Sequence, residues 1–420
     1  MKKILKIFTA ALFVLVSSAG LFSCKEEVEN IPAYPGPLVK RRSDPSVVKH
    51  ADGKYYLVHT YDYGSWSEIK IRSAVSIYRL RSSSDEKTII SSSTATDGAV
   101  PYGYFFGPEL KFIEGQWFLF FTASESSSSS WTQRPFVAVC DDSDPVNGTW
   151  KILGKIQGVK ESEFHDYNNA IETYSLGPTV FEYDGQWYFM YAGRVEDGNV
   201  KFDEDQIADG SLTVNGKVYE DLSKSTMTSY GTANTNAETS VNWQCIFIGK
   251  TSPSDFTKVT ELTIVSVPEY DWECGIYSKH CDNKFNNTDD APQALIHGND
   301  LFVVFSASDI DESYCMGIMK CTDKSNLLSM SSWNKSSAPV FESDSSYQTY
   351  GPGSCSFTKD EDDCYDVMFY TARCQYGLSL ASDGTTGTDA YADKNRAVYA
   401  KSFTWKSNGY PDFGRAGGKD

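Results

Sequence analysis

Three acidic residues in this sequence stand beside prolines that recur along the chain, and together they could do chemistry on a sugar. Asp44 directly precedes a proline, Glu109 directly follows one, and Asp290 lies two residues before another. Two carboxylates that flank a glycosidic bond can hydrolyse it with inversion: one acid protonates the leaving oxygen and one base activates water, across a gap of roughly 6.5–9.5 Å. The structural alternative for Asp44 is a turn, because Asp-Pro often begins one.

These prolines belong to a unit that occurs five times. Each copy has a proline, a spacer of about nine residues, and a turn that is followed by aromatic or aliphatic strand residues. The copies begin at Pro45, Pro108, Pro178, Pro292 and Pro352. The first three have clear hairpin turns, at Asp52-Gly53, Glu114-Gly115 and Asp184-Gly185, and the last two are degenerate. Each unit therefore predicts a β-meander.

The strand segments indicate how these units pack. Runs such as 117–121 and 302–305 are apolar throughout, which is typical of strands buried between neighbouring sheets. Sheets of about four strands arranged radially satisfy this pattern, so we predict an all-β fold, a five-bladed β-propeller, over residues 39–420. The innermost strands of a propeller begin near its axis, so Asp44, Glu109 and Asp290 should face one funnel. A stack of separate sandwich domains is the alternative, but it would need linkers between units, and none is visible.

The interval between the third and fourth prolines is the longest. Residues 195–242 within it are dominated by Gly, Asp, Ser, Thr and Asn. We predict an insertion here, either a loop that shapes the funnel mouth or a partly disordered flap.

Composition narrows the class of partner. A net charge of -18 argues against nucleic acid, which requires clustered Lys and Arg. Aromatic residues make up 14% of the chain, and the faces of Tyr and Trp stack well on sugar rings. We therefore expect a neutral oligosaccharide or polysaccharide as the partner.

The N-terminus has the pattern of a bacterial lipoprotein signal. Lysines precede an apolar run, residues 7–21, that is too short to span a bilayer, and the segment ends in Leu-Phe-Ser before Cys24. This predicts a signal peptide over 1–23, lipidation of Cys24 and a tether over 24–38. The alternative is an ordinary cleaved signal. The expected location is the outer membrane or cell surface, with the protein held by a lipid anchor.

Cysteines and histidines give no metal motif. Nine cysteines remain besides Cys24, and in an oxidising compartment they could form disulfides, with one thiol left over. The closest pairs in sequence, Cys274 with Cys281 and Cys315 with Cys321, are left unassigned. The five histidines show no HExxH pairing, so we expect no cofactor.

Several segments, taken in order, resemble glycoside hydrolase family 43, in particular its exo-acting α-L-arabinofuranosidases, over nearly the whole mature chain. The segments are Ser43-Asp44-Pro45-Ser46, Gly107-Pro108-Glu109-Leu110, 268–273, 305–308 with 314–317, 350–353, 370–373 and 403–405. The resemblance implies a five-bladed propeller with an aspartate base, a second aspartate that raises the pKa of the acid, and a glutamate general acid. It implies Asp44 as the base, a contact from Glu109 to a substrate hydroxyl, and Phe106 at the position of a substrate-facing tryptophan.

The chain departs from this family at three funnel positions. Gly177 replaces the pKa-modulating aspartate, Asp290 replaces the glutamate acid, and Ser354 replaces a histidine associated with a bound ion. The shorter Asp290 withdraws the carboxyl by about 1 Å, a misplacement that can cost about a hundredfold in rate. Without the neighbouring anion, we expect Asp290 to be ionised more often. Glu172 could replace that charge, but a surface position is the simpler expectation.

Two functions follow from these residues. The first is an inverting hydrolase, monomeric, that acts on arabinofuranosyl or xylosyl ends of plant-type polysaccharides, with Asp44 as base and Asp290 as an impaired acid. The alternative is a catalytically inactive, surface glycan-binding lipoprotein on the same scaffold. A protein-docking platform would leave the funnel carboxylates unexplained.

Overall fold

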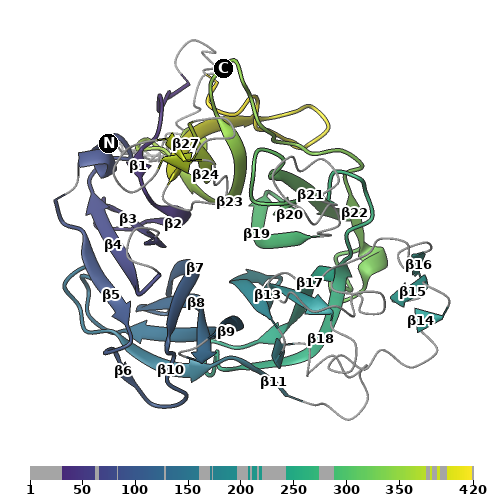
Figure 1. The fold of residues 1–420 in the computed structure, drawn as a ribbon, viewed down its shortest axis with the longest axis horizontal. Coiled ribbons are helices and arrows are strands. Elements are labelled where there is room, and N and C mark those ends of the chain that lie inside the picture. The colour runs from purple at the N-terminus through teal and green to yellow at the C-terminus, as the bar shows by residue number, and fades with distance from the viewer. Residues whose placement is uncertain are drawn as a thin grey trace, which may run out of the picture. The chain divides into compact units, whose positions relative to one another are not determined.

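The computed structural model describes residues 31–420 apart from several gaps. The gaps are 62–65, 83, 127–128, 160–170, 173, 196–206, 209–210, 215–216, 220–242, 274–287, 375–378, 381–385, 388–394 and 419–420. Within the unit Ile31–Asp420, five antiparallel sheets lie around a central axis (Figure 1). The predicted all-β, five-bladed propeller is confirmed.

Each blade is a meander that runs outward from the axis. Blade 1 comprises β2 (Ser43–Lys49), β3 (Tyr55–Thr60), β4 (Glu68–Ala74) and β5 (Lys87–Ser91). Blade 2 comprises β7 (Gly103–Ile113), β8 (Gln116–Ser126), β9 (Ser129–Cys140) and β10 (Lys151–Lys155), with β6 (Ala95–Thr96) parallel to β10. Blade 3 comprises β12 (Ser175–Tyr183), β13 (Gln186–Val195), β17 (Trp243–Thr251) and β18 (Lys258–Ser266), with β11 (Gln157–Gly158) parallel to β18.

The last two blades complete the ring. Blade 4 comprises β19 (Asp289–His297), β20 (Asp300–Ala307), β21 (Cys315–Cys321) and β22 (Trp333–Lys335). Blade 5 comprises β23 (Tyr350–Lys359), β24 (Asp366–Arg373) and β27 (Arg396–Trp405), to which β28 (Pro411–Asp412) is added. Its outer strand β1 (Val39–Lys40) comes from the start of the described chain and pairs antiparallel with β27. The two ends of the ring are therefore joined in one sheet.

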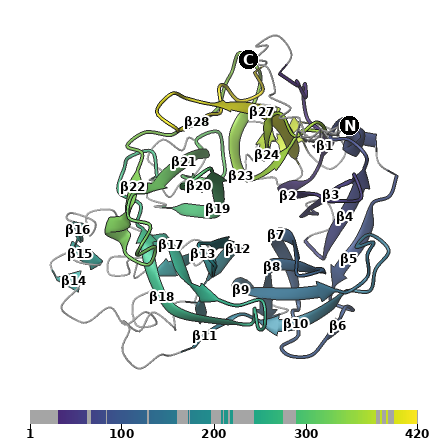
Figure 2. The ribbon, with the colours of Figure 1, turned by 180° about the vertical axis from the view of Figure 1, so that it is seen from behind.

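The core lies between blades. Among the described residues, five buried apolar clusters occur, one at each junction of neighbouring blades. Both faces of the middle strands are consequently covered, which explains why the runs 117–121 and 302–305 are apolar at every position. Figure 2 shows the innermost strands β2, β7, β12, β19 and β23 around the axis.

The hairpin turns follow the predicted chemistry. Glu114 and Gly115 have φ of 50° and 88°, and Asp184 and Gly185 have φ of 50° and 77°. Positive φ at both central residues is the condition for a type I′ turn, whose twist matches that of the flanking strands.

The insertion contains a small sheet of its own. Strands β14 (Ile207–Ala208), β15 (Ser211–Val214) and β16 (Lys217–Tyr219) pair antiparallel within it. The signal segment, Cys24, Cys274 and Cys281 lie outside the described residues. Cys315 and Cys321 are buried thiols and form no disulfide. None of the helices in the described part of the chain has the length and apolar character needed to cross a membrane.

Candidate active site

The residue before each of the five prolines has a left-handed backbone. The φ angles are 52° at Asp44, 50° at Gly107, 56° at Gly177, 45° at Ala291 and 58° at Gly351. At each of these points the register between the innermost strand and its neighbour shifts. Such bulges re-aim side chains, and glycine adopts this conformation without steric cost. Only Asp44 and Ala291 therefore present a side chain from this repeated position.

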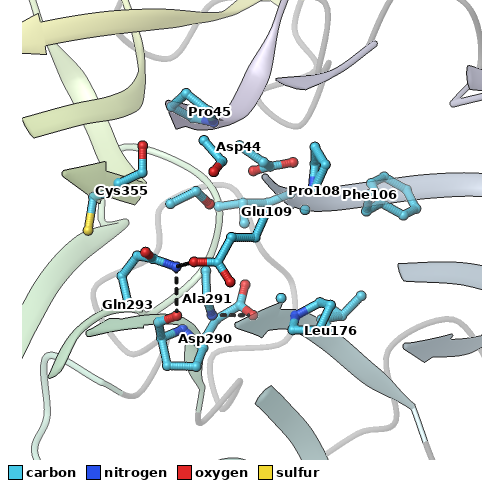
Figure 3. Close-up of a pocket in the computed structure, with 18 of the residues that line it drawn as sticks. Asp44, Pro45, Phe106, Pro108, Glu109, Leu176, Asp290, Ala291, Gln293 and Cys355 are labelled. Carbon is cyan, nitrogen blue, oxygen red and sulfur yellow. Dashed lines mark hydrogen bonds between the residues drawn. The ribbon is translucent and has the colours of Figure 1, made fainter. Parts of the chain in front are cut away.

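The bulges of blades 1 to 4 line a cavity of about 340 Å³, and blade 5 contributes Ser354, Cys355 and Ser356 to its wall. Asp44, Glu109 and Asp290 all line it (Figure 3), so the prediction that three carboxylates face one funnel is confirmed. Phe106 also lines the cavity, as predicted for a substrate-facing residue. Its substrate contact stays a prediction.

Asp44 is held by hydroxyl groups on one carboxylate oxygen. Its Oδ2 accepts hydrogen bonds from Thr60 Oγ1 at 2.7 Å and from Ser43 Oγ at 3.1 Å. Its other oxygen, Oδ1, lies 3.8 Å from Nη1 of Arg396. The backbone N–H of Asp44 donates to Thr371 Oγ1 of blade 5 at 2.8 Å. The side chain is only 14% exposed, and these contacts hold the carboxylate in one orientation.

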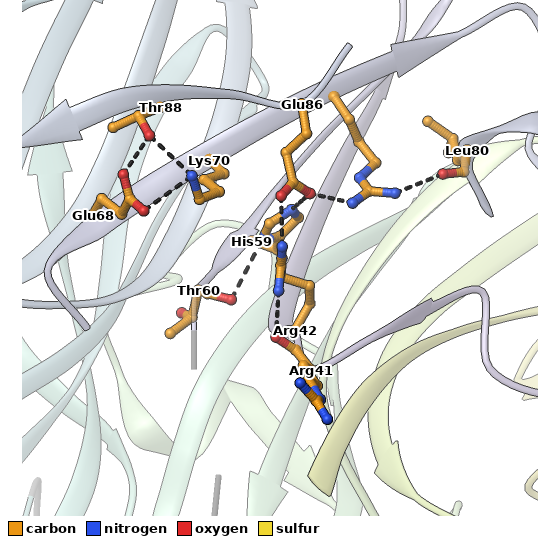
Figure 4. Close-up of polar contacts among 10 residues, drawn as sticks. Arg41, Arg42, His59, Thr60, Glu68, Lys70, Leu80, Glu86 and Thr88 are labelled. Carbon is orange, nitrogen blue, oxygen red and sulfur yellow. Dashed lines mark hydrogen bonds and ion pairs between the residues drawn. The ribbon is translucent and has the colours of Figure 1, made fainter. Parts of the chain in front are cut away.

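A largely buried ion cluster lies next to the strand ends that carry Asp44 and Thr60. Glu86 accepts from Arg42 Nη2 at 2.5 Å, contacts His59 Nε2 at 3.2 Å and pairs with Arg72 (Figure 4). Arg42 precedes Ser43, and His59 precedes Thr60, so the cluster fixes the two strand segments that orient Asp44. Burial lowers the pKa of His59 to about 4. The hydrogen bond with His59 and the contacts with Arg42 and Arg72 hold the pKa of Glu86 well below its usual range despite burial.

Asp290 has the environment of a weak acid. Burial, and to a smaller extent the charge of Asp44, raise its pKa to about 6. The backbone N–H of Ala291, which donates to Oδ1 at 2.8 Å, and the Tyr314 hydroxyl, which donates to Oδ2 at 3.3 Å, oppose this rise. The expectation that Asp290 is ionised more often without the blade 3 aspartate stays a prediction: burial raises its pKa, but a value of about 6 still leaves most of the carboxyl ionised at neutral pH.

Glu109 joins three blades. Its carboxylate accepts hydrogen bonds from the Val180 backbone N–H at 2.9 Å, from Thr179 Oγ1 at 3.0 Å and from Gln293 Nε2 at 3.0 Å. It also pairs with Lys111 at 2.8 Å, and the whole residue is 3% exposed. The predicted contact between Glu109 and a substrate hydroxyl is not tested by this geometry. The four protein contacts support a positioning role for Glu109.

The structure shows what surrounds Gly177, where the resemblance implies an aspartate, and Glu172, which could replace its charge. Gly177 lies against Ala291 of blade 4, so the missing aspartate leaves no gap. Glu172 is 42% exposed and pairs with Lys155 at 2.7 Å, and it is not among the described residues that line the cavity. The predicted surface position of Glu172 is confirmed, and it does not replace the lost charge.

Ser354 lines the cavity at the position of the family histidine, and its backbone N–H donates to Ser306 Oγ at 2.7 Å. A hydroxyl is a poor replacement for imidazole as a metal ligand. Across the described part of the chain, no three His, Cys, Asp or Glu side chains converge as a metal site. The residues present do not fit the ion that the resemblance implies.

Sequence reasoning missed two residues that contact the candidate pair. Tyr314 belongs to a segment, 314–317, that stands out in the sequence only through the family resemblance, and Arg396 begins β27 with no local motif around it. A buried tyrosine hydroxyl or arginine is recognisable as functional only once the fold shows which carboxylate it meets.

A five-bladed propeller whose axial cavity holds an oriented carboxylate and a carboxyl group of raised pKa has the pair of groups that a glycosidase requires. The model of the family "Glycosyl hydrolases family 43" matches residues 34–242 and 252–411. This chain belongs to that family, and the predicted family is confirmed.

Relatives of known function are arabinofuranosidases by name. The chain is 26% identical over 416 residues to an extracellular exo-alpha-(1->5)-L-arabinofuranosidase of Streptomyces avermitilis, covering 97% of this chain and 69% of that protein. It is 28% identical to an enzyme of the same name from Streptomyces chartreusis, over 81% and 82% of the two chains. A solved alpha-L-arabinofuranosidase from Lactobacillus brevis superposes with a TM-score of 0.67 at 26% identity, covering 91% and 96%.

Proposed function

We propose that this protein is an inverting glycosidase that releases arabinofuranosyl residues from the ends of plant-type polysaccharides. The observation that carries the proposal is that Asp44 and Asp290 line one cavity in different electrostatic environments. Asp44 is oriented by two hydroxyls and an arginine, whereas burial raises the pKa of Asp290 to about 6. An oriented carboxylate facing a carboxyl group of raised pKa can provide the base and the acid.

The reaction then needs one water molecule. Asp44 takes a proton from this water as its oxygen attacks the anomeric carbon, and Asp290 gives its proton to the leaving oxygen as the glycosidic bond breaks. Solvent returns both carboxyls to their starting states. Near neutral pH, most Asp290 is ionised, so we expect slow turnover of natural glycosides and better turnover of aryl glycosides, whose leaving groups need little protonation.

The test compares aryl α-L-arabinofuranosides with aryl β-D-xylosides, using Asp44→Asn as the control. Turnover of the arabinoside above this control, with an inverted anomer detected by NMR at early times, is the expected result. A retained anomer would exclude the mechanism, and turnover no greater than that of Asp44→Asn on both substrates would exclude the hydrolase.

A second candidate, a glycan-binding protein, rests on the packing of Gly177 against Ala291, which leaves no third carboxylate at the site. It predicts that calorimetric titration with arabinan oligosaccharides gives heat of binding while the aryl glycosides are not turned over.

We further propose that the protein is exported and held at the cell surface through lipidated Cys24, as a monomer. Support comes from the N-terminal sequence pattern and from two relatives that are named extracellular. Labelling with a fatty-acid analogue should mark the wild type and not Cys24→Ala, and absence of label in both would contradict the anchor.

A further inference from the structure

Three aromatic rings, those of Phe106, Trp66 and Tyr104, pack in a row at one side of the cavity. Trp66 and Phe106 both line the cavity, with ring centroids 5.4 Å apart. Tyr104, two residues before Phe106 on β7, stacks with Trp66 at 6.4 Å and an interplanar angle of 29°. Tyr104 itself is not among the described residues that line the cavity. The rings therefore form a row from the cavity wall to a point beyond it.

The backbone at both outer rings is held in an unusual conformation. Trp66 has φ of 55° and Tyr104 has φ of 53°, in the left-handed region that bulky side chains seldom occupy. A hydrogen bond from the Phe105 N–H to the Trp66 carbonyl at 2.8 Å ties the two segments together. Residues kept in strained conformations cluster at binding sites, where the surrounding structure fixes them for function. Here the strain presents two stacked rings beside the cavity.

The size of the cavity indicates which part of a bound glycan these rings could contact. At about 340 Å³ it is near the small end of ligand sites, so the rest of a bound polysaccharide must leave through its mouth. Neutral sugar rings have apolar C–H faces that pack on aromatic rings, while their hydroxyls stay in water. Trp66 and Tyr104 are both half-buried, so part of each side chain remains exposed for such packing.

We propose that Trp66 and Tyr104 form a platform that binds the second sugar of the glycan chain, next to the sugar held in the cavity. This inference rests on the proposed function for the identity of the glycan, and on the ring geometry for the site. It makes the protein selective for oligosaccharides of two or more sugars over free monosaccharides.

The experiment measures binding without turnover. In an Asp44→Asn background, linear α-1,5-arabinotriose, xylotriose and L-arabinose are titrated calorimetrically. Trp66→Ala and Tyr104→Ala should each raise the Kd for the trisaccharide by about tenfold. The reason is that one aromatic ring stacked on a sugar changes Kd by a factor on the order of ten. Binding of L-arabinose should not change in Tyr104→Ala, because Tyr104 is not among the described residues that line the cavity, and should weaken less than binding of the trisaccharide in Trp66→Ala.

Two further variants control for folding. Trp66→Phe keeps a ring and should retain most of the trisaccharide affinity. Tyr78→Ala removes a 58% exposed aromatic ring that is not among the described cavity residues, and should change nothing. Each variant is first checked for an unchanged thermal midpoint, and any variant that fails is replaced by Trp66→Leu or Tyr104→Leu.

The outcomes separate this proposal from the hydrolase. Equal weakening of trisaccharide and monosaccharide, no weakening of either, or a parent that binds neither trisaccharide would each overturn the platform. If instead the parent binds a trisaccharide through Trp66 and Tyr104, but the protein with Asp44 intact does not hydrolyse it, the platform stands and the hydrolase fails.

Discussion

Gly177 of blade 3 packs directly on the backbone of Ala291 of blade 4. A Cβ placed on Gly177 would lie 2.9 Å from Ala291 Cα and 3.3 Å from its nitrogen, and φ at Gly177 is 56°. Gly177 stands where the resemblance implies the pKa-modulating aspartate. A side chain at this position would therefore meet the blade 4 backbone at Ala291.

Restoring the aspartate alone should destabilise the fold. Gly177→Asp forces a side chain against backbone atoms that cannot move independently, with an expected cost of about 1–3 kcal/mol in the free energy of unfolding. Ala291→Gly allows the blade 4 backbone more freedom, so the double variant should be more stable than the sum of the single effects predicts. Chemical denaturation of the four proteins measures this coupling, and strict additivity would contradict it.

The pH dependence of turnover should report Asp290. A general acid must be protonated, so kcat/KM should fall about tenfold per pH unit above pH 6, the raised pKa of Asp290. The Tyr314 hydroxyl donates to Oδ2 and lowers that pKa, so Tyr314→Phe should move the falling limb to higher pH.

Asp290→Asn is the matched control for this profile. It should abolish the falling limb and leave residual turnover only of aryl glycosides with good leaving groups. Asp290→Glu extends the carboxyl by about 1 Å and should raise turnover of natural glycosides if reach limits the acid. A falling limb that survives in Asp290→Asn would assign it to another group.

Much of the architecture could be predicted from local signals. The five prolines and hairpin turns recur because the innermost strand of every blade begins near the axis and is followed by a turn that reverses the chain into the next strand. Runs such as 117–121 are apolar because both faces are covered. The pairing of β1 with β27 could not be predicted from its short sequence, because only the closure of the ring brings the two strands together.

The site was less predictable than the fold. The positions of Asp44 and Asp290 followed from the repeat, whereas the pKa of Asp290 depends on burial by residues distant in sequence. The contacts of Glu109 show the same limit. Its position beside Pro108 suggested the funnel, but only the fold shows that its carboxylate meets blades 3 and 4.

Glu109 should matter more for stability than its counterpart in blade 1. Ser46 occupies the same position after its proline and accepts one hydrogen bond from the Leu110 N–H at 3.0 Å. Ser46→Ala should cost about 1 kcal/mol. Glu109→Ala leaves Lys111 and the buried donors of blades 3 and 4 unsatisfied, so we expect a loss of about 3 kcal/mol or more. Equal losses in denaturant titrations would refute the role of Glu109 as a link between blades.

The ion cluster behind Asp44 should make stability fall in mild acid. Burial lowers the pKa of His59 from 6.5 to about 4, so the folded state binds fewer protons than the unfolded state between these values. Stability from this group is complete above pH 6.5 and is lost as pH falls toward 4, by about 3 kcal/mol in total. Glu86 has a lowered pKa too, and therefore loses stability in the same direction, at lower pH.

A buried acid elsewhere titrates with the opposite sign, so the effect of His59 must be isolated by difference. Burial, with the charge of Asp289 beside it, raises the pKa of Glu273, so the contribution of this group to stability falls as pH rises above 4.5. His59→Gln keeps a donor that can reach Glu86 and has no proton to gain. The free energy of unfolding of the wild type, relative to this variant, should therefore drop by about 3 kcal/mol between pH 7 and pH 4. A difference that is independent of pH would mean that His59 titrates normally and that the cluster does not exclude the charged imidazole.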